Sequence, residues 1–192
     1  MKVRTLLIAG AVLVVLAGMN TINISYAKQN RGAVCQLTPT SLELTDLEES
    51  NILFMREEEK LARDVYIVMY EQWDACIFAN ISEAEQQHMD AVKNLITRYG
   101  LTDPVVDDTV GQFTNQDLKL LYDELIAAGS VSLEDALMVG VRIEELDIVD
   151  LEQALTETDR PNILRVFGNL LDGSYNHLDA FNACLAGDCP CL

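Results

Sequence analysis

Residues 82–92 read SEAEQQHMDAV, and this stretch decides how the chain is expected to fold. In an α-helix, Glu85 and His88 lie on the same face as Ile81 and Val92, which belong to an apolar stripe. Burying a carboxylate and an imidazole on such a face requires hydrogen-bonding partners or a ligand. The chain has only 2 histidines, so this one marks either a polar contact in the core or a site.

Apolar residues recur at helical spacing along most of the chain. The first predicted helix covers residues 45–72, where Thr45 and Glu48 can form a capping box. The second helix ends before Gly100. Its start is open between Asp74, which we favour, and Ser82, which would make Glu85 a capping residue.

The second half of the chain predicts three more helices. A short one covers residues 115–128, and a long one begins after Ser132. The last one extends to residue 185, with Asp159 as a candidate cap and Pro161 in its first turn, where a missing N–H costs nothing. No segment predicts a strand, so the expected fold class is all-α.

Polar residues interrupt the apolar stripe of all four long helices. A buried carboxylate without a partner costs several kcal/mol, so it pairs, takes up a proton or binds a metal. Together, four carboxylates and two imidazoles are what a di-iron or di-manganese carboxylate centre requires. The candidate metal ligands are Glu58, Glu85, His88, Glu144, Asp147 and His177.

Distance along the helices tests whether these residues meet. An α-helix rises by about 1.5 Å per residue. With a turn at Asp74, Glu58 and Glu85 lie at roughly 16–24 Å from it, and Glu144 and His177 are similarly placed about Asp159. Each hairpin therefore brings its polar residues to the middle of the bundle, whereas a second helix starting at Ser82 would leave Glu85 at its end.

Four motifs in order resemble a known superfamily: FMREEEKLARDVYIVMYEQW, IFANISEAEQQHMDAV, IEELDIVDL and GSYNHLDAF. Over residues 45–185 the chain resembles a ferritin-like domain family of undefined function, related to the diiron four-helix bundles of ferritin and rubrerythrin. The resemblance implies antiparallel helix pairs joined by a long crossover, residues 100–131, containing the short extra helix. Its ligand pattern falls on Glu58, Glu85 with His88, Glu144 and His177.

The chain departs from that pattern at Ser174, where the superfamily usually has a glutamate three residues before the histidine. Our own inference from the spacing is that Asp147 replaces it. If it does not, the centre holds its second metal weakly or is mononuclear. A register shift of one residue would make Glu57, Glu59 or Glu145 a metal ligand instead, but their positions relative to the apolar stripes predict solvated side chains.

Four side chains near the predicted ligands have two interpretations each. Arg63 and Asp64 predict a surface pair or an interhelical pair. Tyr66 and Tyr175 are candidates either for hydrogen-bond donors behind the metal ligands or for plain core residues.

The N-terminal segment predicts export. Lys2 and Arg4 precede a short apolar run, and SYA ends at Ala27, so residues 1–27 predict a signal peptide, with a retained anchor as the alternative. Residues 28–44 then form a leader loop before the ferritin-like domain at 45–186. The mature chain would be periplasmic or extracellular and, after cleavage, without a membrane span.

The net charge restricts the possible binding partners, and the cysteines restrict the possible disulfide bonds. The net charge of −18 excludes nucleic acid and anionic membranes as partners. Five cysteines stand at 35, 76, 184, 189 and 191, an odd number, so at least one is free or pairs between chains. Residues 187–192 form a cysteine-containing tail, and for CLAGDCPCL at 184–192 we favour a structural disulfide over a metal site.

Three functions are open at this point. The first is a di-metal redox protein with two iron ions, or manganese, that oxidises Fe(II) or reduces O₂ or peroxide. No pair of C-x-x-C motifs is present to supply its electrons. The second is a non-catalytic bundle that binds or stores metal, and storage would need a homo-oligomer. The third is a helical interaction module without metal.

Overall fold

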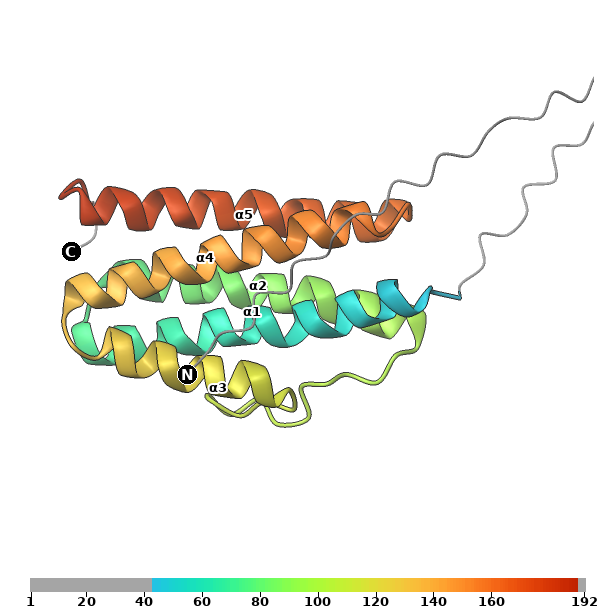
Figure 1. Cartoon of the computed structure of the whole chain (residues 1–192), viewed down its shortest axis with the longest axis horizontal. Helices are drawn as coiled ribbons and strands as arrows, with labels where there is room; N and C mark the ends of the chain where they lie inside the picture. Colours follow the sequence, from blue (N-terminus) through green and yellow to red (C-terminus); the bar gives the residue numbers. More distant parts are fainter. Residues whose placement is uncertain (1–42, 190–192) are drawn as a thin grey trace, which may run out of the picture. The chain divides into compact units, whose positions relative to one another are not determined.

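The fold is an all-helical bundle, seen in a computed structural model that describes residues 43–189 (Figure 1). These residues form five helices and no strand, which confirms the all-α fold class. The helices are α1 (Asp46–Trp73), α2 (Cys76–Tyr99), α3 (Gln116–Gly129), α4 (Leu133–Thr156) and α5 (Pro161–Leu185).

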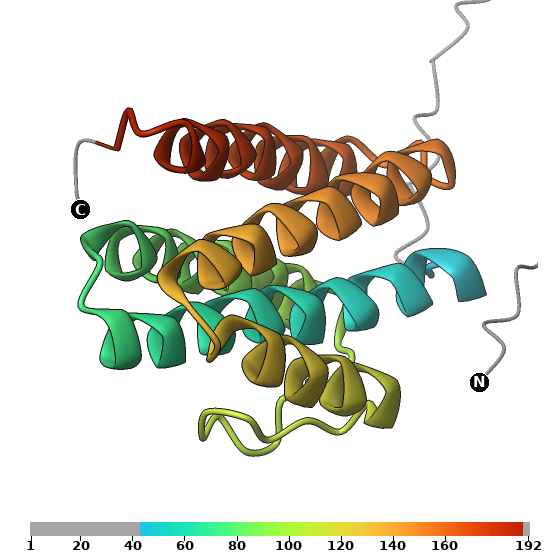
Figure 2. The same ribbon diagram turned by 60° about the vertical axis from the view of Figure 1, so that its left-hand side comes forward.

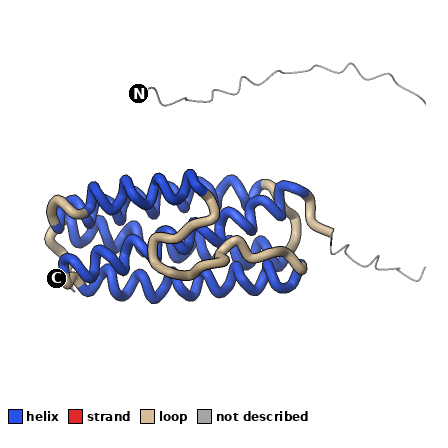
Figure 3. Tube along the Cα trace, turned by 90° about the horizontal axis from the view of Figure 1, so that it is seen from below, coloured by secondary structure: helices blue, strands red, loops and turns tan. Residues whose placement is uncertain are grey.

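Two antiparallel hairpins make up the bundle, α1 with α2 and α4 with α5 (Figures 1 and 2). The crossover between the hairpins contains α3, and its loop folds back over the helices, as the tan tube in Figure 3 shows. Hydrogen bonds to Glu57, Lys60 and Asp64 hold this loop against α1. Helix α2 begins at Cys76, so the prediction of a start near Asp74 rather than Ser82 is confirmed.

Local signals define most helix ends. The capping box of Thr45 and Glu48 is present, and Ser132 caps α4 by accepting from the Asp135 N–H. Asp74 does not cap α2; it ends α1 in a left-handed conformation with φ 53°, which makes the tight turn of the hairpin. The prediction that Asp159 caps α5 is wrong, because Arg160 is the cap residue and provides no side-chain hydrogen bond to the helix.

The core consists of two apolar clusters. One contains Tyr66, Phe78 and Phe181, which pack at ring-centroid distances of 5.3–6.2 Å. The other includes Ile52 and Phe167. Neither cluster contains five buried acids of α1, α2 and α4, which form a polar layer in the bundle: Glu58, Glu59, Glu85, Glu144 and Asp147.

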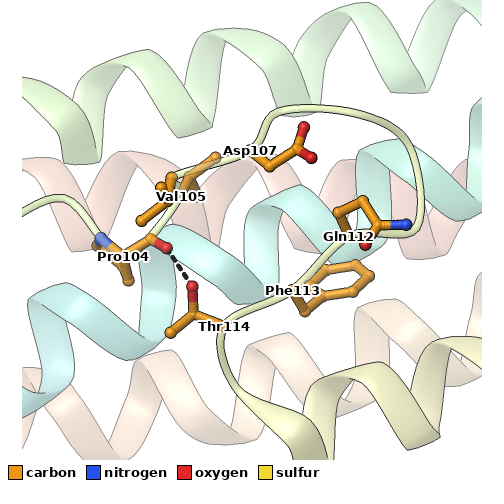
Figure 4. Close-up of a pocket in the computed structure, with 7 residues that line it drawn as sticks. Pro104, Val105, Asp107, Gln112, Phe113 and Thr114 are labelled. Atoms are coloured by element: carbon orange, nitrogen blue, oxygen red, sulfur yellow. Dashed lines mark hydrogen bonds between the residues drawn. The ribbon is translucent and has the colours of Figure 1, made fainter.

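The crossover is folded back on itself and fastened to α1. The Thr114 hydroxyl donates to the Pro104 carbonyl at 2.6 Å, which closes the loop drawn in Figure 4. Glu57 accepts from the backbone N–H groups of Thr114 and Asn115, at the start of α3. Glu57 is therefore buried, and the prediction that it is solvated is wrong because the crossover covers the outer side of α1.

A buried ion cluster provides the second attachment. Asp64 is fully buried and accepts from the Lys60 ammonium, the Arg63 guanidinium and, at 2.9 Å, the Gly111 N–H of the crossover. Lys60 also donates to the Thr109 carbonyl at 2.9 Å. Of the two interpretations of Arg63 and Asp64, a surface pair is wrong, because the pair lies beneath the crossover.

At the C-terminal end, a disulfide joins Cys184 of α5 to Cys189, in agreement with the predicted bridge in the tail. The predicted signal peptide, 1–27, and all but the last two residues of the predicted leader loop lie outside the described residues. Within residues 43–189, no helix combines the length and apolar character needed to cross a membrane.

Candidate metal centre

The polar layer is organised around Glu85 of α2. One of its carboxylate oxygens lies 2.7 Å from Nδ1 of His88 on the same helix. The other lies 2.8 Å from Nδ1 of His177 on α5. The two imidazole rings stack at a centroid distance of 5.6 Å. The carboxylate of Glu85 therefore connects two imidazoles that belong to different hairpins.

Each of the two imidazoles also faces a second glutamate. A Glu59 oxygen lies 3.2 Å from Nδ1 of His88, and a Glu144 oxygen lies 3.6 Å from Nδ1 of His177. This makes two groups, Glu59–Glu85–His88 and Glu85–Glu144–His177, each compact enough to hold a metal ion. The matched depth that the sequence predicts for Glu85, His88, Glu144 and His177 is confirmed by these contacts.

Charge interactions hold the two imidazoles protonated. Burial lowers the pKa of His88, but the hydrogen bonds and charges of Glu59 and Glu85 outweigh it and raise this pKa to about 11. Glu144 and Glu85 similarly raise the pKa of His177 to about 10. Burial raises the pKa of Glu85, yet both imidazoles outweigh it and lower this pKa to about 2.

The pKa values of the other carboxylates in the layer are raised, in contrast to that of Glu85. Burial and the charge of Glu85 raise the pKa of Glu144 to about 8, although Tyr66 donates a hydrogen bond of 2.5 Å to it. Burial raises the pKa of Asp147 to about 7, and burial with the Asp147 charge raises the pKa of Glu59 well above its usual range. Without a cation, protons must therefore neutralise part of this layer.

Unsatisfied atoms show that the layer fits a metal. Within the described residues, five buried side-chain atoms lack a hydrogen-bond partner, and all five belong to this layer or to His177. They include Oε1 of Glu85 and Nδ1 of His177, which are close but not aligned as a hydrogen bond. Carboxylate oxygens and imidazole nitrogens facing one another in this way are ligands suited to iron or manganese.

One predicted ligand does not contact His88 in the structure. Glu59, rather than Glu58, lies against that imidazole, and the prediction that Glu59 is solvated is wrong, whereas Glu145 is exposed as predicted. Glu58 is buried but belongs to neither group of three. A second stripe, at heptad spacing, would have revealed Glu59: Ile52, Met55, Glu59, Ala62, Tyr66 and Met69, all buried.

Asp147 is close to the centre but outside both groups of three. The Ser174 hydroxyl donates to its carboxylate, so Asp147 does occupy space next to the serine that departs from the superfamily pattern. Tyr66 is a hydrogen-bond donor to Glu144, as one of its two interpretations proposed. Tyr175 is neither a donor to a candidate ligand nor a core residue, because it is exposed and donates to Glu152.

Gly173 has no side chain, and the His88 ring occupies the space that a Cβ at this position would need. A Cβ at this position would lie 2.6 Å from Cε1 and Nε2 of the ring, whereas a Cβ at Gly168, five residues earlier on α5, would meet nothing within 4 Å. We therefore expect Gly173→Ala to displace His88 and to weaken metal binding by about tenfold or more. Gly168→Ala is the matched control and should leave binding unchanged. Equal metal affinity of the two variants in a titration would contradict this packing argument.

The chain is thus an α-helical bundle with two acidic–imidazole groups that can hold metal. It belongs to the family described as "Uncharacterized protein domain (DUF2202)", whose match spans residues 48–188 and so covers all five helices except the first two residues of α1.

A relative from Methanocaldococcus jannaschii, the uncharacterized protein MJ0754, is 49% identical over 138 residues, which is 72% of this chain and 75% of the relative. The crystal structure of this hypothetical protein, MJ0754, matches with a TM-score of 0.75 and 47% identity, over 76% of this chain and 83% of that one. The comparison establishes the family and supports the helical fold.

Proposed function

We propose that the chain is a di-metal carboxylate protein of the ferritin-like class, with iron as the metal and manganese as the alternative. The observation that carries the proposal is Glu85, because each of its oxygens faces one imidazole and each imidazole faces one further glutamate. A bound pair of Fe(II) ions would supply two electrons, one from each ion, to reduce O₂ to peroxide or peroxide to water, which makes Fe(II) oxidation or peroxide reduction the proposed activity.

The residues of this chain would have distinct parts in that activity. Glu59 and His88 would hold one ion, Glu144 and His177 the other, and Glu85 both. Tyr66 orients Glu144 through its hydrogen bond. The histidine side chains are 15% and 12% exposed, so small molecules would approach along the α2 and α5 face, while apolar residues on either side exclude bulk water.

Export of the mature chain is part of the proposal, since the sequence of residues 1–27 has the features of a signal peptide. In the periplasm or outside the cell, the partners would be metal ions and O₂ or peroxide. Homo-oligomerisation, which storage of metal would need, stays a prediction.

The test is the metal content of residues 28–192, purified without chelator and after anaerobic loading with Fe(II). Two equivalents of iron are expected, followed by an absorbance change when O₂ or peroxide is added. One equivalent would mean that only one of the two groups of three binds iron. Two equivalents that never turn over would favour a binding or storage protein. A folded protein that takes up no iron or manganese would overturn the proposal and favour the interaction module.

The stability of the metal-free protein should fall as the pH rises. Its pKa values of about 8 for Glu144, about 10 for His177 and about 11 for His88 exceed the ordinary 4.5 and 6.5. The native form therefore binds more protons than the unfolded form, so the stabilisation these groups provide is lost as the pH rises through those values. The lowered pKa of Glu85 has the opposite effect, because it makes the stability rise with pH, but only below about pH 4.5.

Chemical denaturation at about pH 5 and about pH 8 measures this effect. Glu144→Gln, which removes one titrating group, should reduce the decline, and bound metal should reverse it because metal competes with the same protons. A metal-free protein that is more stable at the higher pH would show that the layer is not protonated in this way.

A further inference from the structure

Glu58 and Asp147, the two predicted ligands outside the metal-holding groups, share a small pocket. Its remaining wall is apolar and comes from α1, α3 and α4, with Leu61, Leu118 and Ile143 among its residues. Burying two carboxylates at such a place is costly, since apolar side chains would fill it at lower cost.

Both carboxylates have an oxygen that nothing in the described part of the chain satisfies. Oε2 of Glu58 and Oδ1 of Asp147 are buried without a hydrogen-bond partner. The two residues are only 7% and 6% exposed. Unsatisfied buried carboxylate oxygens lining one pocket are the arrangement that a cation would complete.

Further acids surround these two carboxylates. The strongest charge interactions of Glu58 are with Asp147, Asp150 and Glu59, all of them acids. Asp150 is half-buried and lies one helical turn beyond Asp147. Asp147 in turn interacts with Glu85 and His88 of the metal centre. Carboxylates therefore lead from half-buried Asp150, through Glu58 and Asp147, to the ligands of the centre.

We propose that Glu58, Asp147 and Asp150 form an outer cation site, which admits divalent cations to the metal centre between α1 and α4. The site takes a hard divalent cation, because it offers carboxylate oxygens only. Asp150 receives the cation, and Glu58 and Asp147 hold it in the pocket beside the metal centre. The existence of the outer cation site does not depend on the proposed function, whereas the admission of cations to the metal centre rests on it.

The first experiment counts bound Mn²⁺ from the loss of its free-ion EPR signal, using the full mature chain. We expect the His88→Ala/His177→Ala variant to keep one weakly bound Mn²⁺. Adding Glu58→Gln or Asp150→Asn should weaken this binding by about tenfold or more. Glu145→Gln is the matched control, because Glu145 is exposed on the same helix as Asp150. Circular dichroism confirms that each variant is folded.

The second experiment follows Co²⁺ absorbance as the metal centre of the otherwise unchanged protein fills. We expect Glu58→Gln to slow filling by about tenfold with the same final amount of bound Co²⁺, and Glu145→Gln to have no effect. A lower final amount would make Glu58 a ligand of the centre and overturn the proposal.

Unchanged Mn²⁺ binding in Glu58→Gln would also overturn the proposal and would mean that Glu58 shares a proton with Asp150 instead. The two proposals fail separately. If the unchanged protein binds no histidine-dependent metal, the proposed function is wrong, while the histidine-deficient variant still reports whether the outer site exists.

Discussion

Loading the protein with iron should raise its free energy of unfolding by about 4 kcal/mol for each ion, at a free metal concentration of about 1,000 times Kd. The reason is that the ligands come from both hairpins. Glu59, Glu85 and His88 belong to α1 and α2, whereas Glu144 and His177 belong to α4 and α5. The ion of the Glu85–Glu144–His177 group would link the two hairpins, and both ions would neutralise the excess of buried carboxylates.

The stabilisation should disappear in His88→Ala/His177→Ala. The quantity to compare is the difference in unfolding free energy between the loaded and the metal-free form of each variant, because the alanines also change the metal-free state. Gln87→Ala/Asn176→Ala is the matched control, since both residues are exposed and adjacent to the histidines. If iron stabilises the histidine-deficient protein as strongly as the control, these imidazoles are not ligands.

Asp64→Ala should destabilise the protein by about 3–5 kcal/mol, as expected when one partner of a buried ion pair is removed. Lys60 is fully buried, and Arg63 is almost so. Without Asp64, the Lys60 ammonium keeps only the Thr109 carbonyl as a hydrogen-bond acceptor among the described residues, and the Gly111 N–H loses its acceptor. The crossover would then be held less firmly against α1.

The chain contains its own control for this effect. Lys119 and Asp123 form a second Lys–Asp pair at i, i+4, but their side chains are 33% and 56% exposed, against 0% for both Lys60 and Asp64. Asp123→Ala should therefore cost about 1 kcal/mol or less. Denaturant unfolding of both variants measures the difference. Similar losses for the two would show that burial does not set the strength of the pair.

Much of the candidate site followed from periodicity alone. Glu85 with His88, Glu144 and His177 interrupt apolar stripes at matched depth, and the structure brings all four together. The argument works because helix rise is constant and each hairpin turn is marked by local signals. The same argument failed at Glu57 and Glu59, since it assumed that α1 has one buried face.

The sequence by itself determined the number of long helices, the capping at Thr45 and Ser132, and four of the five residues in the two metal-holding groups. These properties depend on local hydrogen bonds and on helical periodicity. Only the tertiary structure decided that Glu59 rather than Glu58 contacts His88, that Glu58 faces a pocket with Asp147, and that Lys60 and Asp64 are buried. The physical reason is that α2, α3, α4 and the crossover surround α1, so that burial on this helix depends on which segment packs over each face.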